Sequence, residues 1–275
     1  MGIKIKEIYI GDNAPFVLIA GLCVIENRKD TLYIAKAIKR ITEKVNIPFI
    51  FKASFDKANR TSHESFRGVG IKEGLKILRE VRKKLNIPVL TDVHSVQQIR
   101  TVAKSVDIIQ IPAFLCRQTD LLIEAGKTKK IINVKKGQFV DPYSMTYAVK
   151  KIQSTGNKRI LLTERGTSFG YNNLVSDFRS LEIMKEMTNT PVIFDAGHSV
   201  QEPGRLRRSS GGQSKYIPLL CRCAIASGCA GIYLEVHPNP ENALSDIFNT
   251  LRLDKLEQLL IDLKKIDKVI KNVIQ

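Results

Sequence analysis

Residues 47–62, IPFIFKASFDKANRTS, join a short apolar run to a dense polar loop. The apolar run is aromatic and β-branched, which is typical of a buried strand. The loop behind it carries cations together with hydroxyl and amide groups: Lys52, Ser54, Lys57, Asn59, Arg60, Thr61 and Ser62. Such groups are too polar for a core and suit an anionic ligand. A solvated surface turn is the alternative, but the same pattern recurs along the chain.

The recurrence is an alternation of strands and helices. Strands are predicted at Phe16–Ala20, Pro48–Lys52, Val89–Asp92, Ile108–Ile111, Ile131–Val134, Ile160–Thr163, Val192–Phe194 and Gly231–Leu234. Amphipathic helices are clearest at Asp30–Lys44, Ile71–Leu85, Thr119–Gly126, Tyr143–Ser154, Lys215–Ser227 and Arg252–Val273. This α/β order indicates parallel βαβ units. Even spacing, without GxGxxG after the first strand, favours a closed (β/α)8 TIM barrel over an open doubly wound sheet.

Two segments lie outside the alternation. Residues Ile3–Ile10 alternate as a strand and, with the turn Gly11-Asp12-Asn13, predict a short N-terminal β-hairpin or cap. The irregular stretch Ser199–Gln213, which includes Arg208, is typical of a mobile active-site loop. No break in composition divides the 275 residues, so we expect a single catalytic barrel domain over residues 1–275.

Composition limits the class of protein. The apolar fraction of 43% is enough for a sizeable core, and no run of about 18 apolar residues predicts a membrane span. The N-terminal residues lack the apolar segment of a secretory signal, so we expect a cytoplasmic protein. The five cysteines show no paired zinc spacing, and Cys221, Cys223 and Cys229 are predicted to be reduced packing thiols.

The net charge of +17 raises the alternative of a nucleic-acid-binding protein. Many cations have the helical spacing of solvated faces, and no base-stacking aromatics accompany basic patches. We therefore expect no nucleic acid and no membrane partner. The remaining cations lie at strand ends, which favours phosphorylated small molecules.

Cations from several strands are expected to meet, because the active site of such a barrel gathers at the carboxyl ends of the strands. This cationic group comprises Lys52, Lys57, Arg60, Lys135 and Arg165. In an empty site these charges would repel one another. They indicate a multiply charged ligand, such as one with a phosphate and a carboxylate.

A second group could hold a divalent metal. It comprises Cys23, His198, Glu235 and Asp246, from strands one, seven and eight and the loop beyond. These strands become neighbours when the barrel closes. The mixed sulfur, nitrogen and oxygen donors suit Zn, Fe or Mn. The alternative is a histidine that is simply hydrogen-bonded.

Six segments resemble the 3-deoxy-D-manno-octulosonate 8-phosphate synthase family, in order and at family spacing. They are FKASFDKANRTS (51–62), IQIPAFLCRQTDLL (109–122), INVKKGQF (132–139), TERGTSFGYNNLVSDFRSL (163–181), FDAGHSVQ (194–201) and EVHPNPENALSD (235–246). The resemblance implies that phosphoenolpyruvate and D-arabinose 5-phosphate condense with water. The products would be the eight-carbon sugar acid phosphate, a lipopolysaccharide precursor, and inorganic phosphate.

The resemblance also implies residue roles. The phosphoenolpyruvate carboxylate would be bound by Lys52, Ser54 and Lys57, and its phosphate by the Ala113 backbone, Lys135 and Arg165. The pentose would be bound by Asn59, Arg60 and Thr61, the last two reaching its phosphate from a neighbouring subunit. The predicted catalytic residues are His198, Asp92, Asn59, Lys57 and Gln201. The lysines would act electrostatically and stay protonated, without a Schiff base.

The family divides by metal dependence, and its metal-requiring members resemble this chain in having cysteine at position 23, where metal-independent members have asparagine. The resemblance therefore implies a divalent metal on Cys23, His198, Glu235 and Asp246. It would act as a Lewis acid on the aldehyde or in positioning water, and both remain open. The resemblance also implies a homotetramer.

Two related synthases share the fold and are alternatives. The shikimate-pathway 3-deoxy-arabino-heptulosonate 7-phosphate synthase has a second-loop signature resembling KPRTS rather than KANRTS, and sialic-acid-type synthases are the other. The chain also departs from the family pattern at Leu22 (usually Pro), Asn27 (Ser), Thr61 (Ser), Gly197 (Thr) and Phe248–Arg252 (STQLP-like). Gly197 puts the rigidity of His198 in question, and the last departure could alter closure of the final loop.

Overall fold

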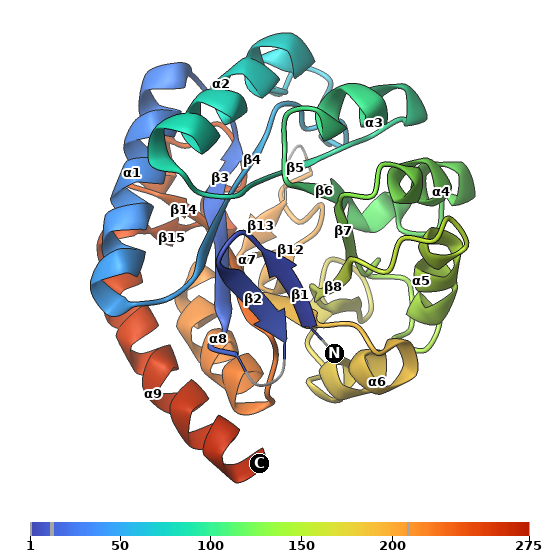
Figure 1. The fold of residues 1–275 in the computed structure, drawn as a ribbon. Coiled ribbons are helices and arrows are strands. Elements are labelled where there is room, and N and C mark those ends of the chain that lie inside the picture. Colours follow the sequence, from blue (N-terminus) through green and yellow to red (C-terminus); the bar gives the residue numbers. More distant parts are fainter. Residues whose placement is uncertain (1, 12–13, 208–209, 275) are drawn as a thin grey trace.

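A computed structural model describes residues 2–11, 14–207 and 210–274 of the chain. Its strands pair in the order β11-β8-β7-β6-β5-β4-β3-β14, and β11 pairs back onto β14. All of these pairings are parallel. Because β11 pairs with β14, the sheet closes on itself as a barrel, with helices around it (Figure 1). The predicted (β/α)8 barrel is confirmed.

The predicted strands all fall on barrel strands. These are β3 (Val17–Val24), β4 (Phe49–Ser54), β5 (Val89–Asp92), β6 (Ile108–Ile111), β7 (Ile131–Lys135), β8 (Ile160–Glu164), β11 (Val192–Asp195) and β14 (Gly231–His237). Short pairs are β9 (Thr167–Ser168) with β10 (Leu174–Val175), and β12 (Gln201–Glu202) with β13 (Gly211–Gly212). Strands β3 and β14 run further than predicted, so Cys23 and Glu235 lie within strands rather than in the loops after them.

The helices surround the barrel (Figure 1). They are α1 (Arg28–Val45), α2 (Gly70–Leu85), α3 (Val96–Ala103), α4 (Thr119–Lys127), α5 (Met145–Gln153), α6 (Arg179–Thr188), α7 (Ala196–Ser199), α8 (Ile217–Ala226) and α9 (Leu256–Ile274). Short 3-10 turns are η1 (Ala113–Leu115), η2 (Ser214–Tyr216), η3 (Pro240–Asn242), η4 (Ile247–Asn249) and η5 (Leu253–Lys255). Helices α3 and α6 were not singled out from the sequence.

The last helix begins later than predicted. Arg252, the first residue of the predicted helix, belongs to β15 (Leu251–Arg252), which pairs with the end of β14. Pairing with a strand requires extended backbone, so the helix starts only at Leu256, after the turn η5. At α1, the Asn27 side chain accepts a hydrogen bond from the backbone N–H of Asp30 and caps the helix. Asparagine at position 27, where the family usually has serine, therefore keeps the capping function.

The N-terminal hairpin lies across one end of the barrel (Figure 1). Strands β1 (Gly2–Ile5) and β2 (Ile8–Gly11) pair antiparallel, and Ile3, Ile5 and Ile10 are buried against the apolar residues inside the barrel. The hairpin is therefore confirmed, but its turn is at Lys6, whose φ is 49°, rather than after Ile10. Asp12 and Asn13 of the predicted turn lie outside the described residues.

The stretch Ser199–Gln213 is partly ordered by the pairing of Gln201 with Gly212 and of Glu202 with Gly211. It follows β11 and borders the cavity described below through Gln201, Pro203, Gly204 and Ser210. Arg208 lies outside the described residues, and the mobility of this loop stays a prediction. Within the described chain, no helix combines the length and apolar character needed to span a bilayer.

Candidate active site

The carboxyl ends of the barrel strands surround a cavity of about 600 Å³. All of the predicted site residues are described by the structure, and all but Cys23 line this cavity: Lys52, Ser54, Lys57, Asn59, Arg60, Thr61, Asp92, Ala113, Lys135, Arg165, His198, Gln201, Glu235 and Asp246. Tertiary structure thus brings both predicted groups, cationic and metal-binding, to one place. Their roles remain predictions.

Strands β3 and β4 approach closely beneath Cys23. A Cβ atom on Gly21 would lie 1.9 Å from the Lys52 carbonyl oxygen, so only glycine allows this approach. As a result the Lys52 ammonium reaches across the strand and donates to the Cys23 carbonyl oxygen at 3.0 Å. It also donates to Glu235 Oε1 at 2.9 Å.

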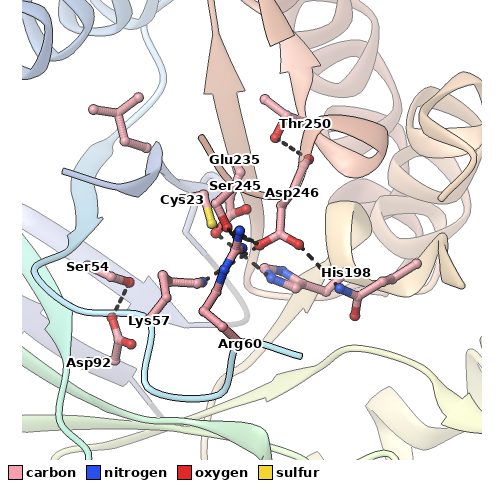
Figure 2. Close-up of polar contacts among 12 residues, drawn as sticks. Cys23, Ser54, Lys57, Arg60, Asp92, His198, Glu235, Ser245, Asp246 and Thr250 are labelled. Atoms are coloured by element: carbon pink, nitrogen blue, oxygen red, sulfur yellow. Dashed lines mark hydrogen bonds and ion pairs between the residues drawn. The ribbon is translucent and has the colours of Figure 1, made fainter. Parts of the chain in front are cut away.

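Cys23, Lys52, Lys57, Glu235 and Asp246 form what we call the thiol side of the cavity. The Cys23 thiol donates to Asp246 Oδ2 at 2.8 Å, and Lys57 Nζ lies 3.8 Å from the same oxygen (Figure 2). One donor atom from each of Cys23, Glu235 and Asp246 lies within 4.8 Å of the other two. Three of the four predicted metal ligands are therefore clustered.

His198, the fourth predicted ligand, lies beside this cluster. Its Nδ1 is 2.8 Å from Asp195 Oδ2, and its backbone N–H donates to Asp195 Oδ1 at 2.9 Å. These contacts leave Nε2 facing Glu235 Oε1 at 3.9 Å. Asp195 was given no role by sequence analysis, although its place at a strand end, three residues before a predicted ligand, was an available signal.

The donor set of the thiol side fits a metal ion. Glu235 Oε2 is buried and has no hydrogen-bond partner among the described residues. A buried carboxylate oxygen without a partner is costly, and a cation would satisfy it. A thiol, two carboxylates and an imidazole within reach suit a borderline divalent ion.

Two of the three remaining cations, Lys135 and Arg165, form what we call the arginine side, and the charge of Asp195 acts on both. Lys135 Nζ donates to Asp195, and Arg165 Nη2 donates to Gln201 Oε1 at 2.9 Å. Arg165 Nη1 is buried and has no acceptor in the described chain. A buried guanidinium with a free N–H is a ready donor for a phosphate or carboxylate oxygen.

The two sides displace lysine pKa values in opposite directions. Burial lowers the pKa of Lys52, but the charges of Glu235 and Asp92 raise it more, so it lies above its ordinary value. Burial also lowers the pKa of Lys135. Asp195 opposes that effect while Arg165 and Lys52 add to it, and the pKa falls to about 8. At neutral pH both lysines therefore keep their proton, and Lys135 is the one that loses it as the pH rises past about 8. That the lysines stay protonated beside bound anions stays a prediction.

The Cys23 thiol is protonated in this arrangement. Burial raises its pKa well above the ordinary value, and the neighbouring charges of Asp246 and Glu235 raise it further. Binding a metal as thiolate would therefore release a proton.

Asp92 organises the wall between β4 and β6. It accepts hydrogen bonds from Ser54 Oγ and, at 3.0 Å, from His94 Nε2. Burial raises the pKa of Asp92, but its contacts with His94 and the charge of Lys52 lower it more, so Asp92 stays ionised. His94 also lines the cavity, and its buried Nδ1 has no partner among the described residues. Sequence analysis gave His94 no role.

The loop after β4 is tied to the segment after β14 within the same chain. Arg60 donates to Ser245 Oγ at 2.5 Å and to the Leu244 carbonyl oxygen at 3.2 Å, beside Asp246 (Figure 2). Arg60 and Thr61 border this chain's own cavity. Their predicted reach into a neighbouring subunit is not tested by a single chain.

Two departures from the family pattern are in contact. A Cβ atom on Gly197 would lie 2.8 Å from the carbonyl oxygen of Asn249, which belongs to the unusual segment Phe248–Arg252. The absence of a side chain at 197 therefore makes room for the carbonyl group of Asn249. His198 remains held by Asp195 despite the glycine before it.

Comparison with known proteins agrees with the sequence motifs. A sequence model described as the DAHP synthetase I family matches residues 1–272. The chain is 57% identical over 269 residues to the 2-dehydro-3-deoxyphosphooctonate aldolase of Rickettsia bellii (strain OSU 85-389), covering 98% of both chains. It is 55% identical to the proteins of that name in Rickettsia prowazekii (99% of this chain, 98% of the relative) and Geobacter sulfurreducens (98% of each).

Proposed function

The chain belongs to the DAHP synthetase I family, and we propose that it is a 3-deoxy-D-manno-octulosonate 8-phosphate synthase, that is, a 2-dehydro-3-deoxyphosphooctonate aldolase. It would condense phosphoenolpyruvate, D-arabinose 5-phosphate and water to the eight-carbon product and phosphate, in the synthesis of a lipopolysaccharide sugar. Relatives of that name match it at 55% identity or more over nearly the whole chain. The shikimate-pathway alternative is not favoured.

The observation that carries the proposal is the difference in free donors and acceptors between the two sides of one cavity. On the arginine side, Lys135 pairs with Asp195, and Asp195, Asp246, Glu164 and Glu235 act on Arg165 through their charges. Lys135 and Arg165 both line the cavity, where two cations suit a phosphate group. The free Nη1 of Arg165 supplies a donor for it. Lys52 and Ser54, on β4 across the cavity, are suited to the phosphoenolpyruvate carboxylate.

Binding in this orientation would fix the enol for reaction. Several cations hold the anion in place before the aldehyde arrives, which lowers the entropic cost of bringing the two together. C3 of the enol then forms the new bond to the aldehyde carbon, water adds at C2, and the C–O bond to phosphate breaks. Asp92, His198 and Gln201 border the cavity where these carbons would lie.

We propose that Cys23, His198, Glu235 and Asp246 hold a divalent ion, Zn, Fe or Mn, in the working enzyme. Bound there, the ion would supply a Lewis acid for the aldehyde oxygen or for water. Asp195 would hold the His198 ring in the tautomer that leaves Nε2 free, as carboxylate partners of metal-binding histidines do. The partnerless Oε2 of Glu235 supports this proposal.

We also propose a homotetramer in the cytoplasm. Exposed aromatic side chains follow β6, β7 and β8 and continue onto α5: Phe114, Phe139, Tyr143, Tyr147, Phe169 and Tyr171. Aromatic residues are enriched in protein interfaces, which supports association on this side. The proposed substrates are intermediates of cytoplasmic sugar metabolism. Light scattering after size exclusion would measure the oligomeric state, and a monomer would overturn the tetramer.

One assay tests the reaction. Purified protein is mixed with phosphoenolpyruvate and arabinose 5-phosphate, and phosphate release is followed. A parallel series replaces the pentose with erythrose 4-phosphate, the acceptor of the shikimate-pathway synthase, or with N-acetylmannosamine for a sialic-acid-type synthase. We expect turnover with arabinose 5-phosphate, and faster turnover with either alternative would refute the assignment.

The metal is tested separately. Treatment with a chelator should abolish phosphate release, and added Zn²⁺, Fe²⁺ or Mn²⁺ should restore it. Full activity in protein shown by elemental analysis to contain no metal would refute the metal proposal and leave the reaction standing.

A further inference from the structure

Tyr233, on β14, has a buried hydroxyl group without a partner. Two positions before Glu235, it faces the inside of the barrel, because side chains alternate along a strand. The whole residue has 0% exposure, and its Oη has no hydrogen-bond partner in the described chain. Tyr233 also lines the main cavity, so its ring forms part of the cavity floor.

The ring lies beneath the cations that the phosphoenolpyruvate site would use. Lys135 Nζ is 3.7 Å from the ring centroid, within the range of a cation–π contact, and Lys52 Nζ is 5.8 Å from it. The ring of His198 is 6.2 Å away, between centroids. Tyr233 thus lies between the thiol side and the arginine side.

At this buried position, the hydroxyl group of Tyr233 lowers the stability of the folded protein. Burying a hydroxyl without a partner costs about 1–3 kcal/mol, and phenylalanine would fill the same space without that cost. A buried polar atom left without a partner at a cavity calls for an acceptor that is not part of the protein. A phenol, with an ordinary pKa of about 10, keeps its proton at neutral pH, so the group remains a donor.

We propose that Tyr233 Oη donates a hydrogen bond to the carboxylate of bound phosphoenolpyruvate. This inference rests on the proposed function. The carboxylate is favoured over the phosphate because Tyr233 shares β14 with Glu235, which pairs with Lys52, the lysine proposed to bind the carboxylate. The phosphate already has the free Nη1 of Arg165 as a donor.

The lysine side chains that cover the Tyr233 ring are consistent with this role. Lys52 and Lys135, which lie above the ring, are themselves buried and are held by Glu235 and Asp195. An anion entering the cavity competes for both ammonium groups. Movement of these groups toward the anion would open the phenol edge to the cavity.

The test is Tyr233→Phe, which removes only the hydroxyl. Calorimetry of the purified full-length protein would measure the affinities for phosphoenolpyruvate and for inorganic phosphate, which shares the phosphate contacts but has no carboxylate. We expect the phosphoenolpyruvate affinity to fall about tenfold, the equivalent of about 1.4 kcal/mol, with phosphate affinity unchanged. The melting temperature should stay the same or rise, because an unsatisfied group is lost. Tyr171→Phe, at a 98% exposed position, is the matched control and should change neither affinity.

Two outcomes would overturn the inference: phosphoenolpyruvate affinity within twofold of the unaltered protein, or an equal loss for inorganic phosphate. Phosphate release by the unaltered protein separates this failure from failure of the proposed function. If the unaltered protein turns over both substrates while Tyr233→Phe binds phosphoenolpyruvate normally, only the role of Tyr233 is lost.

Discussion

Two buried lysines, Lys52 on the thiol side and Lys135 on the arginine side, line one cavity and differ in their charge surroundings. Lys52 lies against Glu235 and close to Asp92, and its pKa is raised. Lys135 lies against Asp195 but shares that carboxylate with Arg165, and its pKa is lowered to about 8. Burial is nearly equal at the two sites, at 1% and 5% exposure, so the balance of neighbouring charges decides the direction.

The difference in charge surroundings also suits the two sides of the cavity to different kinds of ligand. On the thiol side, Lys52 and Lys57 are matched by Glu235 and Asp246, and a buried carboxylate oxygen remains free for a cation. On the arginine side, the charge of Asp195 acts on both Lys135 and Arg165, and a guanidinium N–H without an acceptor among the described residues remains for an anion. The predictions below test this division, from the largest expected effect to the smallest.

The largest effect is expected from Lys52→Met. It leaves Glu235 buried and unpaired, so the free energy of unfolding should fall by about 3–5 kcal/mol, measured by urea denaturation of metal-free protein. The matched variant Lys135→Met should cost less, about 1–2 kcal/mol, because Asp195 keeps its contacts with His198 and repulsion of Arg165 is relieved. Equal losses would mean that the two sides do not differ in charge balance.

Cys23→Ala should act on the thiol side alone. We expect metal affinity, measured by calorimetry with Zn²⁺, to fall by more than about 100-fold, since loss of an outer partner of a ligand already costs about 10–100-fold. Phosphoenolpyruvate affinity should change less than about twofold. Cys223→Ala, at a partly exposed thiol on α8, is the control. A comparable loss of metal in the control would count against the assigned ligand.

Gly197→Thr would restore the residue usual in the family. Its Cβ would press on the Asn249 carbonyl oxygen and displace the segment that follows Asp246. We expect a loss of about 1–3 kcal/mol in thermal unfolding experiments, together with weaker Zn²⁺ binding and little change in phosphoenolpyruvate affinity. A more stable variant would show that the segment can shift without strain.

The smallest effect is a pH dependence on the arginine side. Because the pKa of Lys135 is about 8, its positive charge is present below that pH and is lost as pH rises through it. Phosphoenolpyruvate affinity should therefore fall between about pH 7 and 9, by up to about tenfold. In Lys135→Arg the charge persists, and the affinity should be nearly flat over this range. An equally steep fall in that variant would assign the pH dependence to another group.

Much of the fold was predictable because strands and helices are local patterns. Each predicted strand lies on a barrel strand, since an apolar run bounded by turns can be recognised from a few residues of sequence. The turn of the N-terminal hairpin and the start of the last helix were misplaced. In both cases a strand pairing determines the backbone conformation: the pairing of β1 with β2, and that of β14 with β15.

The sequence by itself determined which chemical groups this protein has and at which end of the barrel they meet, because strand ends can be recognised from residue types. It treated the cations and the metal ligands as separate groups. Only the tertiary structure decided how the two groups pair: Lys52 with Glu235, which is 183 positions away, and Lys57 with Asp246. Electrostatic energy depends on distance in space, so which lysine keeps its proton depends on barrel closure rather than on chain order.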